Sequence, residues 1–436
     1  MNIFKFRRPN CEIGEVVVTV PAEFTHEQRK ATETACRLVG LKRVTLLNEP
    51  TAAVLDYQRY LISEGKEELV KGANVLVIDF GGGTLDINCC EMKDNHDVTV
   101  VKNGGSQDLG GNNFDFVMQD VIKQKIVDEL GIDDYFDIPK KATPAIKKKI
   151  AARNGRLRKE AEIAKIALSK QVEYCINLAH IFEGEQDDEF TDIIEEEIKI
   201  RRSEFEQAIE PLVKKFSECV RECTGKGRRA FTKTNVDLVL LVGGTSKMPI
   251  IKKELEKRFK VESFANDNFD PMTAVAKGAC FYAKNLAGKG VTEQKVYDTI
   301  PFDIGLKVQQ NKFLPMCKDG SPLPTSSKTL ISTESCGQET VEFEIYCGNK
   351  MFVDSEGMKK ECSFKITGLP KTESKISFEI ELTVQDDGML RVKAKSIGTE
   401  TEFRIDDKEY QMDLRPVDRM YVRVEKHFKG FLPPPF

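Results

Sequence analysis

The chain has 436 residues, of which 40% are hydrophobic and 31% charged, and its formal net charge is −4. This length predicts two or three domains, and the near balance of charge argues against a broad surface for nucleic acid or an acidic membrane. No stretch approaches eighteen consecutive apolar residues, so we expect no transmembrane helix.

Of the 12 cysteines only Cys89–Cys90 and Cys219/Cys223 are close in sequence, no CxxC pair occurs, and the four histidines do not cluster near cysteines. Zinc binding is therefore not expected, and the scattered thiols are typical of a reducing compartment, which predicts a cytoplasmic location.

Near the start, residues 14–20 are rich in β-branched side chains and precede Pro21, which predicts a strand. Thr25 and Gln28 form a capping-box pattern, so we expect a helix to begin there. Its inward apolar stripe is predicted to comprise Ala31, Ala35, Leu38 and Val39.

The stretch Val75–Asp86 reads VLVIDFGGGTLD, an apolar run followed by an acid, three glycines, a hydroxyl and a second acid. Backbone N–H groups of glycines can close around a phosphate, and Thr84 can add a hydroxyl donor. Asp79 and Asp86 lie where a magnesium ion or an attacking water would need carboxylates. The alternative is a tight hairpin whose glycines serve the turn alone.

Further along, residues 140–170 have the pattern of one or two long charged helices. The predicted inward positions are Ile146, Ile150, Leu157, Ala161, Ala164 and Leu168. A second apolar run, Val236–Val242, ends in two glycines, and Thr245 or Ser246 is expected to cap the next helix. Such an arrangement directs N–H donors toward an anion or a flat ring. The alternation of strands and helices up to about Leu286 indicates an α/β unit.

Beyond residue 290 the hydrophobic pattern changes to strict alternation, as in residues 341–346 and 376–384. Asp387-Gly388 then forms a turn signal before the next alternating segment. This pattern predicts a separate domain of antiparallel strands.

Five motifs in this order resemble those of the seventy-kilodalton heat-shock chaperones. They are VTVPA at 18–22, NEPTAA at 48–53, DFGGGT at 79–84, LGGNNFD at 109–115 and LVGGTSKMP at 241–249. The resemblance implies an α/β actin-like (ribonuclease H-like) ATPase domain over 12–288, an interdomain linker at 289–300 and an antiparallel β-sandwich peptide-binding domain over 301–410. Residues 411–436 would form a tail without the helical lid.

The resemblance also implies ATP or ADP with Mg²⁺ as cofactors. It assigns catalytic roles to Asp79, Glu49 and Thr84, with Asp79 near the metal and Glu49 acting on it through a water. Residues matching nucleotide contacts are Gly81, Gly82, Gly83, Thr84, Gly110, Gly111, Glu162, Lys165, Ser169, Gly243, Gly244 and Lys247. From the residues alone, Glu49 could equally be a favourable charge at a helix start. Likewise, Glu162, Lys165 and Ser169 could be plain surface residues.

In the second domain the resemblance places Leu306, Ile331, Val341 and Phe343 along the peptide groove, with ordinary sandwich core as the alternative. Glu334 replaces a small apolar residue that arches over that groove.

The sequence also departs from the family pattern. Nothing before Val18 matches the first phosphate hairpin or the subdomain with a catalytic lysine. We therefore expect an ATPase domain that is incomplete at its N-terminus, with an open sheet edge, an uncovered apolar face and weak or absent hydrolysis. Ile166 replaces an arginine that stacks on adenine, and Met272 replaces an acid. The linker keeps Asp298 but is less apolar than usual, which predicts weakened interdomain coupling.

The resemblance thus predicts a molecular chaperone that couples ATP binding to the binding of unfolded or extended hydrophobic peptides, with hydrolysis impaired. J-domain co-chaperones and nucleotide-exchange factors are the expected partners, and neither nucleic acid nor membrane is expected. The open alternatives are an ATPase-dead binding protein (a holdase or co-chaperone) and a non-functional gene fragment. A sugar kinase or actin-like filament protein would not be followed by the β-sandwich.

Overall fold

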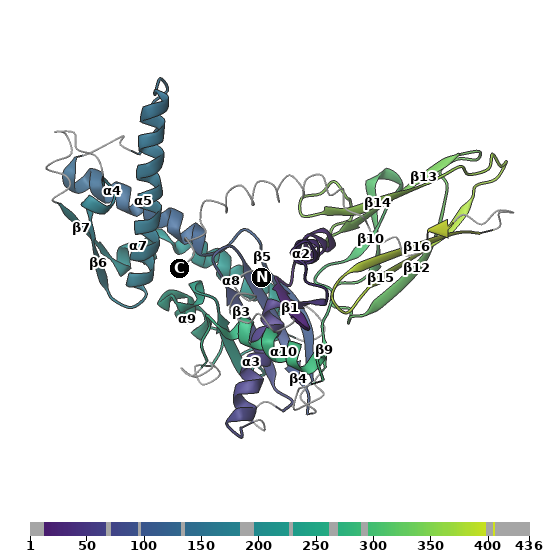
Figure 1. Ribbon diagram of the computed structural model, residues 1–436, viewed down its shortest axis with the longest axis horizontal. Helices are drawn as coiled ribbons and strands as arrows, with labels where there is room; N and C mark the ends of the chain where they lie inside the picture. The colour runs from purple at the N-terminus through teal and green to yellow at the C-terminus, as the bar shows by residue number, and fades with distance from the viewer. Residues whose placement is uncertain are drawn as a thin grey trace. The chain divides into compact units, whose positions relative to one another are not determined.

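The computed structural model describes residues 13–66, 71–94, 97–131, 136–183, 196–225, 230–260, 269–288, 295–397 and 404–405 (Figure 1). The chain divides into two compact units, Met1–Pro301 and Phe302–Phe436. Among the described residues, no helix is both long and apolar enough to cross a bilayer.

A five-stranded sheet forms the centre of the first unit, in the order β8-β3-β4-β5-β9. Its strands are β3 (Asn74–Phe80), β4 (Leu85–Met92), β5 (Val98–Ser106), β8 (Leu238–Val242) and β9 (Val296–Tyr297). Strand β3 pairs antiparallel with β4 and parallel with β8, so the predicted glycine hairpin joins two central strands. Every residue of β3 is buried, because both faces of the sheet are covered.

Alternate residues of β3 enter two separate cores, as the two-residue period of a strand requires. Leu76, Ile78 and Phe80 join one core and Val75 and Val77 the other. The first core includes residues of α4 (Gly111–Leu130), α5 (Pro144–Leu168), α7 (Arg202–Ala208), α8 (Glu210–Gly225) and α9 (Pro249–Glu256). The second includes residues of α3 (Glu49–Ser63) and α10 (Ala274–Leu286), which lie side by side in Figure 1.

Two smaller sheets complete the first unit. Parallel strands β1 (Val16–Val20) and β2 (Val44–Asn48) flank α2 (His26–Leu38), and antiparallel strands β6 (Glu173–Asn177) and β7 (Glu197–Arg201) follow α5. A short 3-10 helix, η2 (Leu178–His180), follows β6. The strand predicted at 14–20 and the antiparallel strands around the glycine hairpin are present.

Helix α2 begins with the predicted capping box, since the Thr25 hydroxyl accepts from the Gln28 amide and the Gln28 side chain accepts from the Thr25 amide. The predicted apolar stripe is wrong. Leu38 and Val39 are 42% and 47% exposed, and the buried residue of this helix is Arg29. Leu38 is nine residues from Arg29, which at about 100° per residue places it on the opposite face.

Helix α5 is one continuous helix across the segment predicted as one or two. Five of the six predicted inward positions are buried. The exception is Ile146, in the first turn, which is 44% exposed. The prediction fails there because the helix extends past the core that its remaining turns cover.

The end of the predicted linker packs within the first unit. Residues Val296–Tyr297 form β9, which pairs parallel with β5. The carboxylate of Asp298 is buried and accepts hydrogen bonds from the Asn48 side-chain amide, the Thr51 hydroxyl at 3.5 Å and the Thr299 amide at 2.8 Å. Residues 289–294 lie outside the described residues.

The second unit is a sandwich of two four-stranded sheets, ordered β11-β10-β13-β14 and β12-β15-β16-β17. The strands are β10 (Ile304–Val308), β11 (Lys312–Cys317), β12 (Thr325–Ser332), β13 (Thr340–Cys347), β14 (Lys359–Thr367), β15 (Ser377–Val384), β16 (Leu390–Ile397) and β17 (Arg404–Ile405). All their pairings are antiparallel, as the alternating pattern predicted. The described residues end at 405, so predictions for the tail lie beyond them.

Replacing Asp298 with alanine is expected to lower the unfolding free energy of the first unit by about 3 kcal/mol, because buried donors on Asn48 and Thr299 would lose their acceptor. Urea denaturation of the whole chain measures this loss. Asp120→Ala, at an 80% exposed carboxylate on α4, is the matched control. Equal denaturation midpoints for the two variants would contradict the buried position of Asp298.

Candidate functional site

Three carboxylates gather where β3, β4 and the start of α3 meet. Glu49 is the first residue of α3, and Asp79 pairs with Asp86 across the β3–β4 ladder. Burial raises the pKa of Asp79 to about 7, and the charges of Glu49 and Asp86 add to this effect. Burial and the Asp86 charge likewise raise the pKa of Glu49 to about 7. The three side chains thus form a cluster of mutually repelling acids.

Asp86 differs from its two neighbours because several donors surround it. Burial raises its pKa to about 6, while hydrogen bonds from the Thr84 hydroxyl and the amides of Ala22 and Glu23 act in the opposite direction. The Ala22 amide lies 3.1 Å from Oδ1. Thr84, predicted as a phosphate donor, thus directs its hydroxyl to Asp86 in this structure.

Three glycine-containing turns converge beside these acids. The amides of Gly111 and Asn112 donate to the carbonyl oxygens of Gly81 and Gly82 at 2.9 and 2.8 Å. From a third segment, the Thr245 hydroxyl donates to the Gly81 carbonyl at 2.7 Å. The predicted turns at 81–84, 110–111 and 243–246, far apart in sequence, therefore lie together.

The close approach of the first two turns requires glycine at position 110. A β-carbon there would lie 2.4 Å from the carbonyl carbon of Gly83 and 2.5 Å from the oxygen of Gly82. Gly243 is also near the acids, since a β-carbon there would lie 3.0 Å from Oδ1 of Asp79. Gly82 and Gly83 are exposed, which leaves the tip of the hairpin open to a ligand.

The sequence predicted that Thr245 or Ser246 would cap the following helix, but neither residue does so. They lie in a 3-10 turn, η4 (Thr245–Lys247), and α9 begins at Pro249 with Met248 as its N-cap. The Thr245 hydroxyl is bonded to Gly81, and the Ser246 hydroxyl donates to the Gly243 carbonyl at 2.7 Å. Both hydroxyls therefore stabilise the glycine turns.

The predicted nucleotide contacts on α5 have different surroundings. Lys165 forms a 2.6 Å ion pair with Asp115 and donates to the Gly111 carbonyl at 3.3 Å, so it lies at the glycine turns. Ser169, at the end of the helix, donates to the Lys165 carbonyl. Glu162 is exposed, as are Gly244 and Lys247 on the facing segment.

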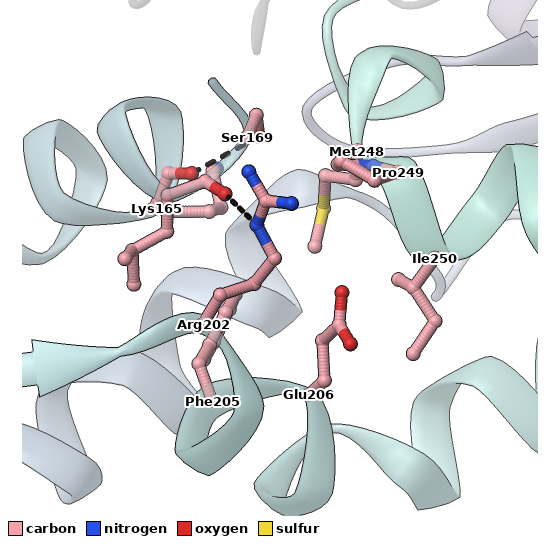
Figure 2. Close-up of a pocket in the computed structure, with 9 residues that line it drawn as sticks. Lys165, Ser169, Arg202, Phe205, Glu206, Met248, Pro249 and Ile250 are labelled. Carbon is pink, nitrogen blue, oxygen red and sulfur yellow. Dashed lines mark hydrogen bonds between the residues drawn. The ribbon is translucent and has the colours of Figure 1, made fainter. Parts of the chain in front are cut away.

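A narrow cavity of about 10 Å³ separates the end of α5 from Met248, Pro249 and Ile250. Figure 2 shows the Arg202 guanidinium and the Glu206 carboxylate pointing into this space. Arg202 donates through Nε to the Leu168 carbonyl at 2.6 Å and through Nη2 to that of Gln171 at 3.0 Å. A space of this size holds about one water molecule, so a larger ligand would need these segments to separate.

The two apolar replacements noted in the sequence are both exposed. Ile166 on α5 is 51% exposed and Met272 is 61% exposed. The Met272 sulfur lies 3.7 Å from where a β-carbon of Gly244 would be. An adenine ring placed against Gly244 would therefore meet a thioether.

In the second unit, three of the four predicted groove residues lie in the sandwich core. Leu306, Val341 and Phe343 are at most 7% exposed. The Phe343 ring stacks on Phe364 with centroids 5.1 Å apart and meets Phe378 of the other sheet edge-on. Ile331, on β12, is half-buried, and its neighbour Leu330 is 66% exposed.

The acids near the glycine turns fit a magnesium–nucleotide better than a metal held by protein alone. Within the described ranges, no group of three or more His, Cys, Asp or Glu side chains is arranged to hold a metal ion. Mg²⁺ usually keeps several waters and binds through one or two carboxylates together with substrate phosphates. Asp79 and Glu49, with raised pKa values, would gain most from such a cation.

Two arginines of this region gave no clear signal in the sequence. Arg29 donates to the Asn48 side chain at 2.7 Å and to the Ala22 carbonyl at 3.1 Å, thereby supporting the residue that precedes Glu49. Arg202 lies at the end of α5. From the residues next to it in the sequence, each arginine is indistinguishable from an ordinary exposed surface arginine.

Stability should depend on pH through the acid cluster. The folded-state pKa values of Glu49, Asp79 and Asp86 are raised, so their contribution to stability is fully present below about pH 4 and is lost as pH rises through 6 to 7. Asp79→Asn should therefore be more stable than the unchanged protein at pH 8, by about 3 kcal/mol, with a smaller difference at pH 5.

Chemical denaturation at both pH values measures this difference, with Asp120→Asn on α4 as the exposed control. A stability difference between Asp79→Asn and the unchanged protein that is the same at both pH values would contradict the charge repulsion.

Comparison with known proteins shows the family of the chain. The family model of the Hsp70 protein matches residues 9–429. The chaperone protein DnaK of Thermosipho africanus is 30% identical over 395 residues, which cover 90% of this chain and 61% of that protein. The chaperone protein DnaK 3 of Synechococcus sp. is 31% identical over 390 residues, covering 89% of this chain and 55% of that protein. The chain thus spans less than two thirds of the length of these relatives, and it belongs to the Hsp70 family.

Proposed function

We propose that the first unit binds ATP or ADP with Mg²⁺ and that the chain acts as a molecular chaperone of the Hsp70 type. The observation that carries this proposal is the convergence of three glycine turns on buried acids, tied together by bonds to the Gly81 and Gly82 carbonyls. Glycine turns offer backbone N–H groups to phosphate oxygens, and the acids suit a hydrated Mg²⁺.

In this proposal, the phosphates lie against Gly81–Gly83, Thr84 and Gly110–Gly111. Asp79 and Glu49 face the metal, Glu49 through a water. The adenosine lies between α5, with Glu162, Lys165 and Ser169, and the turn of Gly243, Gly244 and Lys247. The bound Mg²⁺ would neutralise charge in the acid cluster and so relieve the repulsion that raises the pKa values there.

We further propose that ATP hydrolysis is impaired in this polypeptide. Phosphoryl transfer depends on positive charge placed around the transferred group. Burial and neighbouring carboxylates raise the pKa values of Asp79 and Glu49. Within the described part of the chain, no cationic side chain is among the groups that shift these two pKa values, so the negative charge of the two acids is not balanced there. Arg29 acts on Asp86, but its guanidinium is already bonded to Asn48 and Ala22. Lys165 is paired with Asp115.

The second unit would bind extended hydrophobic peptides, as the family resemblance implies. Of the four residues predicted for the groove, Ile331 is the most accessible. Leu306, Val341 and Phe343 would contribute mainly by supporting the strands around it. J-domain co-chaperones and nucleotide-exchange factors are the corresponding partners, and a cytoplasmic location remains part of the proposal.

Nucleotide binding is tested by calorimetry and thermal unfolding with Mg-ADP. The unchanged chain should release or absorb heat on titration and should unfold at a higher temperature with the ligand. Gly110→Ala should weaken binding at least about tenfold, because the added methyl would push the first two turns apart.

Gly155→Ala is the matched control, since a β-carbon at Gly155 on α5 meets no atom within 4 Å. Circular dichroism of both variants checks that they fold. If the unchanged chain gives neither heat nor a thermal shift with Mg-ADP, the ligand assignment is wrong.

Hydrolysis is tested by single-turnover assays with radiolabelled ATP on the 436-residue polypeptide. Its rate should be at least about a hundredfold below that of the Thermosipho DnaK protein at the same temperature, given the usual effect of losing cationic stabilisation. A comparable rate in the two proteins would refute the impairment and leave nucleotide binding intact.

A further inference from the structure

A second cavity, separate from the glycine turns, lies between the end of α3 and one face of α10 and has a volume of about 410 Å³. The two helices touch closely at one point, where a β-carbon on Gly278 would lie 1.7 Å from the Ala52 carbonyl oxygen. The cavity lies at the C-terminal end of α3, beside the face of α10 that carries Lys277, Phe281 and Lys284. Residues that line it include Arg59, Ile62, Lys277, Cys280, Phe281 and Lys284.

The cavity combines an apolar wall with a cationic rim. Ile62 and Phe281 are half-buried and provide the apolar surface, and no carboxylate is among the lining residues that the structure describes. Arg59 is balanced by a 2.7 Å ion pair with Asp56. Lys277 and Lys284 are exposed, and within the described ranges neither forms an ion pair.

We propose that this cavity binds a small amphiphilic carboxylate, with its alkyl or aryl body against Phe281 and Ile62 and its anionic group between Lys277 and Lys284. The volume lies within the range of small-molecule sites, which are mostly apolar with a few polar groups that orient the ligand. Lys277 also interacts with the nearby Asp270 carboxylate, whose pKa it helps to lower. Because the rim carries two ammonium groups and the described lining has no carboxylate, it favours an anion over a neutral ligand. The inference does not depend on the candidate nucleotide site. The cavity lies at the C-terminal end of α3, whereas Glu49 is at the N-terminal end, and the two sites share no residue.

Cys280 in the wall of the cavity provides a local reporter. It is exposed, as are Cys175 on β6 and Cys336 in the second unit, which serve as internal controls. Alkylation of the folded whole chain by iodoacetamide can be followed at each cysteine by mass spectrometry. Saturating octanoate should slow alkylation of Cys280 about fivefold or more, because a ligand bound against Phe281 and Ile62 would cover the neighbouring thiol, and should leave Cys175 and Cys336 unchanged.

Three probes separate the contributions of charge and apolar surface. Octanoate carries both, octanol has the same chain without the charge, and inorganic phosphate has charge without a chain. Octanoate should protect Cys280 most strongly. Equal protection by octanol, or by phosphate, would overturn the assignment of an amphiphilic anion.

Charge reversal provides the independent test. The double variant Lys277→Glu with Lys284→Glu should weaken octanoate binding at least about tenfold by calorimetry, since the rim would then repel a carboxylate. The matched control reverses two exposed lysines elsewhere in the first unit, Lys214→Glu with Lys253→Glu. Unchanged affinity in the first double variant, or an equal loss in the control, would refute the proposed site.

Discussion

Three hydrogen bonds to the carbonyl groups of Gly81 and Gly82 hold the candidate nucleotide site together. They come from the Gly111 amide, the Asn112 amide and the Thr245 hydroxyl, at 2.7 to 2.9 Å. These donors belong to the start of α4 and to the 3-10 turn after β8, so the bonds fix two distant segments to the β3–β4 hairpin. Because these bonds use carbonyl groups, they leave the amides of Gly82 and Gly83 for a ligand, whereas the Gly81 amide donates to the Thr84 carbonyl at 3.1 Å.

A second network connects the acid cluster to the end of the predicted linker. Asn48 precedes Glu49, donates to the Asp298 carboxylate and accepts from Arg29. Asn103 on β5 donates to the Thr299 carbonyl at 3.2 Å. The position of Glu49 at the start of α3 is therefore supported by residues that follow β9, which provides a physical link between the linker and the candidate site.

The residue pattern predicted the strands, the glycine hairpin and an antiparallel second domain, because each depends on a local period or on residues close together. The family resemblance, in addition, implied the sandwich and assigned Glu49 and the turn at Gly110 and Gly111 to the site, and the structure brings these residues into one region with Asp79. The sequence could not show that Thr245 bonds to Gly81 or that Lys165 pairs with Asp115, since these contacts join distant segments. The bond from Thr84 to Asp86 is local, but it depends on the rotamer of the Thr84 side chain, which the residue types do not specify. The wrong stripe on α2 has the same origin, because the buried face of that helix is set by the polar partners of Arg29.

Amide hydrogen exchange at Gly111 and Asn112 tests most directly whether the turns are assembled before a ligand binds. The structure predicts that both amides exchange slowly in the nucleotide-free protein, as slowly as amides of the buried strand β3, because each donates to a carbonyl of the glycine hairpin. Exchange of both amides at the rate of an unstructured peptide, while β3 remains protected, would show that the three turns do not form a site in the free chain.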